Sequence, residues 1–210
     1  MITVKNVTKK YGKFKAVDNI SFEINDGEII GLLGPNGAGK STTMNILTGF
    51  IEPTEGEVII NGYNISKKPK KAKKCIGYMP EGVPLYKDMT VKEFVTYMAE
   101  LKGVKKEQIK ESVDQAIQDT WLQNVRKVLI RNLSKGYKQR VSMAGALVGN
   151  PEIIILDEPF NGIDKSSIQQ IKDYLLKIKS DKIILIASHI ESDISDLCDE
   201  IIEMDLGKIN

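Results

Sequence analysis

A glycine-rich segment that ends in a lysine and a serine points most directly to chemistry. It consists of Gly34, Pro35, Asn36, Gly37, Ala38, Gly39, Lys40 and Ser41, and Thr42 follows it. The spacing fits GxxxxGK[ST], and the pattern predicts a strand over residues 28–33 before it and a helix from Lys40 to about Thr48 after it. In that context backbone N–H groups and the helix N-terminus bind a phosphate, Lys40 reaches the β- and γ-phosphates, and Ser41 offers an oxygen to Mg²⁺. We therefore expect this loop and Thr42 to bind a nucleotide; an ordinary glycine-rich turn is the alternative, which the flanking strand and helix disfavour.

Two adjacent carboxylates follow a second apolar run. Residues 153–156 read as a buried strand, and Asp157, Glu158 and Pro159 come directly after it. In a nucleotide site Asp157 would hold the Mg²⁺ shell, and Glu158 would polarise a water for attack on the γ-phosphate. A solvated acidic turn is the alternative, and the phosphate loop in the same chain makes it the weaker one.

The only histidine, His189, follows a third apolar run over residues 183–188. A lone histidine is more often structural or exposed than catalytic. However, Gly34, Asp157 and His189 each come after a predicted buried strand, and the carboxyl ends of parallel strands meet along one edge of a sheet. We expect His189 to contact the γ-phosphate or the attacking water there.

Ser134 and Gly136 precede a stretch whose apolar positions, from Val141 to Val148, have helical spacing. An N-cap explains a serine at this position by itself. The segment is also a second helix N-terminus that can bind an anion. Two such sites beside one nucleotide motif raise the idea that the second binds the nucleotide of another copy of the chain.

Periodicity divides the chain into three parts. Short apolar runs predict strands at residues 2–5, 21–24, 28–33, 56–60 and 76–79. From Thr90 the pattern turns helical: a Thr90–Glu93 capping box opens one helix, Gly103 ends it, and residues 107–121 form a second. Strands at 153–156, 183–188 and 200–204 follow, with a helix over 166–178. We therefore predict an α/β fold whose first third is mostly β and whose middle is a helical insertion.

Composition excludes several classes of protein. The 210 residues are 41% hydrophobic and carry 30 basic against 28 acidic side chains, too even a balance for a nucleic-acid partner. Cys75 and Cys198 lie far apart, so we expect neither a disulfide framework nor a zinc site. No apolar run approaches the roughly 20 residues that span a bilayer, so we expect a cytoplasmic chain that reaches a membrane only through a partner. The lysine-rich stretch 67–74 is interpreted as a solvated face.

The order of these motifs resembles the nucleotide-binding domain of ATP-binding cassette (ABC) transporters over nearly the whole chain. The motifs are, in order, GPNGAGKS, LSKGYKQR, IIILDEP, FNGID and a late histidine. The resemblance implies one α/β domain over residues 1–210: a catalytic P-loop core at 1–83 and 149–210 that includes an N-terminal antiparallel β portion, and an inserted helical subdomain at 84–148. It implies a head-to-tail dimer in which each ATP lies between the phosphate loop of one copy and Ser134 and Gly136 of the other. Tyr11 is then the aromatic that stacks on adenine, Glu81 occupies the Q-loop position, and residues 161–164 resemble the D-loop, with Asp164 facing the second copy.

Two departures from the family pattern concern the proposed sites. The family usually reads LSGGQ where this chain has LSKGY at residues 133–137, which keeps Ser134 and Gly136. Glu81 replaces the usual glutamine, a variation associated with exporter-type (ABC-2-like) members, and we expect it to contact Mg²⁺ or a water.

The sequence stops at Asn210, a few residues after the last predicted strand, where many relatives continue into further helices, so it is either a short member or part of a longer chain.

We therefore predict the ATPase subunit of an ABC transporter, with ATP and Mg²⁺ as cofactors. Its expected partners are a second copy of itself and a membrane permease, contacted through the helical subdomain and residues 81–89, so that the chain lies peripherally on the cytoplasmic face of the membrane. The alternatives are an ABC ATPase with a mechanical or regulatory role outside transport, and a P-loop kinase. A kinase protects its γ-phosphate from water and has little use for Glu158 or for a second anion site at Ser134.

Overall fold

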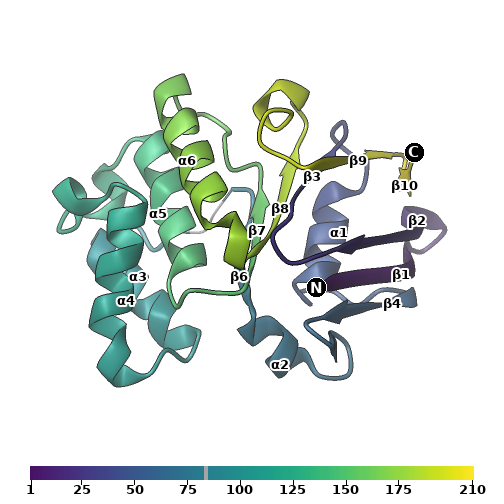
Figure 1. Cartoon of the computed structure of the whole chain (residues 1–210), viewed down its shortest axis with the longest axis horizontal. Coiled ribbons are helices and arrows are strands. Elements are labelled where there is room, and N and C mark those ends of the chain that lie inside the picture. The colour runs from purple at the N-terminus through teal and green to yellow at the C-terminus, as the bar shows by residue number, and fades with distance from the viewer. Residues whose placement is uncertain (83–84) are drawn as a thin grey trace.

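Two β-sheets with helices around them make up the structure, a computed structural model that describes residues 1–82 and 85–210 (Figure 1). The larger sheet has six strands in the order β10-β9-β3-β8-β7-β6; β9 to β6 are parallel, and β10 pairs antiparallel with β9. Its strands are β3 (Ile29–Leu33), β6 (Ile76–Met79), β7 (Ile153–Asp157), β8 (Ile183–Ser188), β9 (Glu200–Asp205) and β10 (Lys208–Ile209). The carboxyl ends of β3, β7 and β8 therefore lie at one edge, as the three apolar runs predict.

The smaller sheet is antiparallel, in the order β2-β1-β4-β5. Its strands are β1 (Ile2–Tyr11), β2 (Phe14–Ile24), β4 (Glu55–Ile60) and β5 (Tyr63–Asn64). The first two are longer than the predicted strands at 2–5 and 21–24, because the pairing continues past register shifts into polar residues. As a result Tyr11 and Phe14 face each other across the turn at Gly12.

Side chains of the parallel strands alternate between two apolar cores. Ile153 and Ile155 share a core with helix α1 (Lys40–Leu47) and the antiparallel sheet. Ile154 and Leu156 share the other with helices α5 (Lys135–Leu147) and α6 (Lys165–Ile178). Since every residue of β7 is buried, the strand is covered on both faces, as a parallel strand requires. Helices α1 and α5 therefore pack on opposite faces of the sheet (Figure 1).

A third apolar core joins α5 to helices α3 (Val91–Leu101) and α4 (Lys106–Asp119). The capping box is present: Glu93 N donates to Thr90 Oγ1 at 3.3 Å, and Thr90 N donates to the Glu93 carboxylate at 2.7 Å. The helix predicted to reach residue 121 ends at Asp119, because Trp121 adopts a left-handed backbone with φ of +54°. The boundary expected between residues 83 and 84 lies outside the described residues.

The remaining elements are short. The six lysines predicted to form a solvated face flank or occupy helix α2 (Pro69–Lys74), where they are exposed and Ala72 is buried. The 3₁₀ turns are η1 (Gln123–Val125), η2 (Ile130–Asn132), η3 (Lys179–Asp181) and η4 (Glu191–Asp193). Within the described ranges, no helix is long and apolar enough to cross a membrane.

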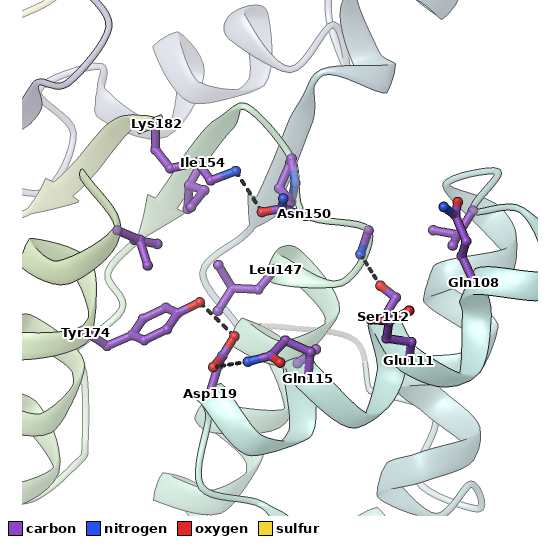
Figure 2. Close-up of a pocket in the computed structure, with 15 residues that line it drawn as sticks. Gln108, Glu111, Ser112, Gln115, Asp119, Leu147, Asn150, Ile154, Tyr174 and Lys182 are labelled. Atoms are coloured by element: carbon purple, nitrogen blue, oxygen red, sulfur yellow. Dashed lines mark hydrogen bonds between the residues drawn. The ribbon is translucent and has the colours of Figure 1, made fainter. Parts of the chain in front are cut away.

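Polar contacts join helix α4 to helix α6 and to the loop after α5 at a pocket of about 490 Å³ (Figure 2). Tyr174 Oη on α6 donates to Asp119 Oδ2 on α4 at 3.0 Å. Gly149 N donates to Ser112 Oγ on α4 at 2.8 Å. Thus α4 meets α6 and the loop after α5 through hydrogen bonds there, beside the apolar packing of the cores.

Candidate functional site

The glycine loop connects β3 to α1 and encloses the Lys40 side chain. Gly39 caps α1 with φ of +105°, and a Cβ there would lie 2.5 Å from the Ala16 carbonyl oxygen, so only glycine fits. Lys40 Nζ donates to the carbonyl oxygens of Gly34 at 2.6 Å and Pro35 at 3.2 Å. With Lys40 only 6% exposed, its ammonium group is held inside the loop, at the N-terminus of a helix.

A pocket of about 300 Å³ lies along this loop. An aromatic pair, a glycine loop and two carboxylates line it: Tyr11, Phe14, Ala16, Asn36, Gly37, Gly39, Lys40, Ser41, Thr42, Glu81 and Glu158. Tyr11 and Phe14 are 52% and 65% exposed, so both rings present open faces. This arrangement offers a stacking surface for a planar base, N–H groups for phosphates, and oxygen atoms for a metal or water.

Phe14 is a residue of the pocket that sequence reasoning missed. Its signal is the sequence Tyr11-Gly12-Lys13-Phe14, in which two aromatics flank a glycine turn. The pairing of Tyr11 with Phe14 at the end of β1 and β2 brings both rings to the pocket.

Asp157, the last residue of β7, carries a buried carboxylate in which one oxygen atom lacks a hydrogen-bond partner among the described residues. It is 2% exposed, and its Oδ1 atom finds no hydrogen-bond donor within the described part of the chain. Burial raises the pKa of Asp157 to about 6, with smaller upward contributions from the charges of Glu81 and Glu158, while the Ser41 hydroxyl and the Lys40 ammonium oppose the rise. A hard cation would offset both the cost of burying the Asp157 charge and the repulsion from the neighbouring carboxylates.

The oxygen atoms around Asp157 suit Mg²⁺, which prefers oxygen ligands and keeps several waters. The orphaned Oδ1 atom of Asp157 is the observation that favours such an ion. Residues 1–82 and 85–210 contain no group of three or more His, Cys, Asp or Glu side chains that could hold a metal by themselves. The ion would therefore need phosphate oxygens and water in addition to Asp157, Ser41 and Glu81.

Glu158 and His189 meet at the edge of the sheet where the sequence places them. His189 Nδ1 lies 2.8 Å from Glu158 Oε1, and the Glu158 side chain is 8% exposed against 37% for His189. Glu158 has a left-handed backbone with φ of +51°, which is rare outside glycine, asparagine and aspartate. Its N–H group donates to the Ala187 carbonyl oxygen at 3.0 Å, which ties the residue to β8.

Ser134 and Gly136 lie apart from the pocket, at the N-terminus of α5 on the other face of the sheet. Ser134 is the N-cap, and its Oγ atom accepts from Tyr137 N at 3.4 Å while the residue stays exposed. Gly136 packs against Ile163, since a Cβ on it would lie 3.3 Å from Ile163 Cγ2. Within one chain, these residues are not brought to the phosphate loop.

The remaining predicted site residues lie outside the pocket that Tyr11 and Phe14 line. Gly34 and Pro35 line a second pocket with His189 and Glu191, and Ala38 is buried. Asp164 caps α6 of its own chain, accepting from Ser167 N at 3.0 Å.

Comparison with known proteins identifies the family of this arrangement. The sequence profile described as ABC transporter matches residues 17–161. The uncharacterized ABC transporter ATP-binding protein MJ1023 of Methanocaldococcus jannaschii is 40% identical over 208 residues, covering 99% of this chain and 75% of that protein. The lipopolysaccharide export system ATP-binding protein LptB of Haemophilus influenzae is 35% identical over 213 residues, covering 100% of this chain and 88% of that protein.

Solved structures agree with the sequence comparison. A dimeric structure of MJ0796, a bacterial ABC transporter cassette, matches with a TM-score of 0.91 at 28% identity, over 100% of this chain and 97% of that one. A dimeric post-hydrolysis state of the same cassette, bound to ADP and Pi, matches with a TM-score of 0.89 at 28% identity, over the same shares. The expected mixed α/β cassette fold is confirmed.

Proposed function

This chain belongs to the ABC transporter family as an ATP-binding, ATP-hydrolysing subunit, and we propose that it powers export through a separate membrane permease. The observation that carries the hydrolytic part is the Glu158–His189 pair, 2.8 Å apart, beside a pocket with a phosphate-binding loop. A binding module without hydrolysis would have no need of a buried carboxylate held in a left-handed backbone at that position.

The residues of the pocket divide the work of hydrolysis. Tyr11 stacks on the adenine, the backbone N–H groups of residues 34–42 bind the phosphates, and Lys40 turns from the loop carbonyls to the β- and γ-phosphates. Glu158 accepts the proton of the attacking water, and His189 fixes the Glu158 carboxylate and reaches toward the γ-phosphate.

Asp157, Ser41 and Glu81 are the residues that would hold Mg²⁺. When bound, the ion neutralises charge on the phosphate oxygens during transfer to water. Asp157 supplies its orphaned Oδ1 atom, and Ser41 at the start of α1 supplies a hydroxyl oxygen. Glu81 completes the arrangement directly or through a water.

Two copies of the chain form the complete catalytic unit in this proposal. Ser134 is exposed at a helix N-terminus that it shares with Gly136, and neither residue lines the phosphate-loop pocket of its own chain. In a head-to-tail dimer that N-terminus binds the γ-phosphate held by the phosphate loop of the second copy. The dimeric state of the MJ0796 cassette supports an assembly of two.

The permease part of the proposal rests on the family and on the surface near Glu81. Residues 85–89 and the helical part of the chain follow Glu81, and Tyr86 among them is 51% exposed. A permease docked there would sense whether the pocket is closed, and would hold the chain peripherally on the cytoplasmic face of the membrane. Export is supported by the relative LptB, the ATP-binding protein of a lipopolysaccharide export system.

Affinity purification from detergent-solubilised membranes of the source cell tests the transport role. Recovery of a multi-span membrane protein with the wild-type chain, whose ATPase rate then rises in the complex, is the expected result. Lys40→Ala serves as the matched control, because it keeps the docking surface and removes hydrolysis. Recovery of ribosomes or DNA in place of a membrane protein would contradict the proposal and favour an ABC ATPase outside transport.

A further inference from the structure

The turn that carries Glu158 is held by helix α5 of the same chain. Gln139 Nε2 donates to the carbonyl oxygens of Glu158 at 3.0 Å and Pro159 at 3.2 Å. Lys135 Nζ, one turn earlier on α5, lies 3.4 Å from Asn161 Oδ1, and Gly136 packs on Ile163. The N-terminal half of α5 therefore contacts the whole stretch that follows β7.

The backbone of Glu158 needs such support. Its φ of +51° is sparsely populated for a glutamate, and such a conformation persists only where the surroundings hold it. Asn161 N also donates to the Glu158 carbonyl oxygen at 3.2 Å, and Glu158 N donates to Ala187. The Gln139 contacts to the Glu158 carbonyl group come from a side chain on another element. They hold the backbone of the residue whose carboxylate contacts His189.

We propose that Gln139 is a positioning residue, which holds Glu158 in its left-handed conformation and thereby couples the state of α5 to hydrolysis in the same chain. The proposal rests on the proposed function, in which Glu158 is the base and the N-terminus of α5 binds the ATP of a second copy. Gln139 lies little more than one helical turn after Ser134. A displacement of α5 when the second copy docks therefore moves the donor that fixes Glu158.

The test compares the wild-type chain with Gln139→Ala and Gln139→Met, the second of which keeps the side-chain length but removes the donor. Gln118→Ala is the matched control, because Gln118 is an exposed glutamine on α4. Both Gln139 variants should lower kcat by about tenfold or more, since small displacements of a reacting group cost that much, while ATP affinity by calorimetry stays within about twofold. The control should keep wild-type kcat.

A second comparison separates positioning from general damage. In a Glu158→Gln background, where no carboxylate remains to be positioned, adding Gln139→Ala should change the residual single-turnover rate by less than about twofold. The double variant should also still dimerise with ATP, since the N-terminus of α5 is unchanged. A loss of the same factor in both backgrounds, or wild-type kcat in both Gln139 variants, would overturn the positioning role.

The wild-type chain distinguishes failure of this inference from failure of the proposed function. If the purified wild-type chain, alone or with its permease, shows no ATPase activity, the proposed function fails. If it hydrolyses ATP and the Gln139 variants match it, only the inference about Gln139 fails. A Gln139→Ala protein that is unfolded by circular dichroism leaves Gln139→Met to decide, because that variant preserves the packing.

Discussion

His189 Nδ1 lies 2.8 Å from Glu158 Oε1, and the contact joins the carboxyl ends of two neighbouring parallel strands, β8 and β7. The two side chains differ in exposure, 37% for His189 and 8% for Glu158. The buried carboxylate therefore has a fixed partner on one side and the nucleotide pocket on the other. This contact ties the Glu158 carboxylate to His189, as the proposed role of Glu158 as general base requires.

Glu158→Gln should lower ATP turnover by about 10² to 10⁴, the range for loss of a general base, and leave ATP binding intact. The amide keeps the size of the side chain and cannot accept the proton of the attacking water. Steady-state ATPase assays and calorimetry measure the two quantities. Because ATP then persists between two copies, the variant should elute from a sizing column as an ATP-dependent dimer. A monomer at high protein and ATP concentrations would count against head-to-tail assembly.

Asp157→Asn should change the pH dependence of stability in the absence of metal and nucleotide. Burial raises the pKa of Asp157 to about 6, so the folded chain binds this proton more tightly than the unfolded chain does. The resulting stabilisation is complete below the unfolded pKa near 4 and is lost as the pH rises through 6. At pH 7 the ionised, buried carboxylate is therefore expected to cost the fold on the order of 2 to 3 kcal/mol.

Thermal unfolding in EDTA from pH 5 to pH 7.5 measures this effect. Asparagine keeps the shape of the side chain without the charge, so the melting temperature of Asp157→Asn should rise relative to wild type as the pH increases. The shift should be several degrees for a chain of this length. Parallel curves over the whole pH range would show that the Asp157 carboxylate does not carry the cost.

Glu81→Gln should keep the ATPase rate within about tenfold of wild type and shift the Mg²⁺ concentration for half-maximal activity. The Glu81 carboxylate lies in the same pocket as Ser41 and raises the pKa of Asp157, so its charge acts on the position where the ion would bind. Attraction to the ion and repulsion from the γ-phosphate are comparable, which keeps the net effect on rate small. Overlapping Mg²⁺ titrations of the two proteins would assign Glu81 to the permease surface.

Much of the site was predictable because long apolar runs mark buried parallel strands. The runs ending at Leu33, Leu156 and Ser188 place the glycine loop, Asp157 and His189 at one edge of the sheet, where the structure has them. The fold class followed from the same runs, with the helical insertion indicated by the capping box at Thr90.

Other features depend on tertiary contacts that leave little trace in the sequence. Strands β1 and β2 extend through polar residues to Tyr11 and Phe14, because hydrogen bonding between the two strands does not require apolar side chains. The left-handed backbone of Glu158 and the hydrogen bonds from Gln139 join residues 19 positions apart in sequence on two packed elements. No local pattern encodes such a contact.

Mixing two inactive variants tests most directly the claim that each ATP is hydrolysed between two copies of the chain. Lys40→Ala removes the charge that faces the phosphates and should abolish ATP binding to its own loop. Gly136→Asp places a negative charge at the N-terminus of α5, where it repels the γ-phosphate of the second copy. Each variant alone should be inactive, because both sites of its dimer are damaged.

In a mixed dimer, one site combines the intact phosphate loop of the Gly136→Asp copy with the intact α5 of the Lys40→Ala copy. Random mixing makes half of the dimers mixed, each with one intact site, so the ATPase rate should recover to about a quarter of the wild-type rate. Circular dichroism of both variants is the control for folding. A mixture in which Gln118→Ala replaces one of the two variants is the control for mixing. If the mixture is no more active than the two variants measured separately, the shared site is contradicted. Gly136 and Lys40 would then act on the same ATP within one chain.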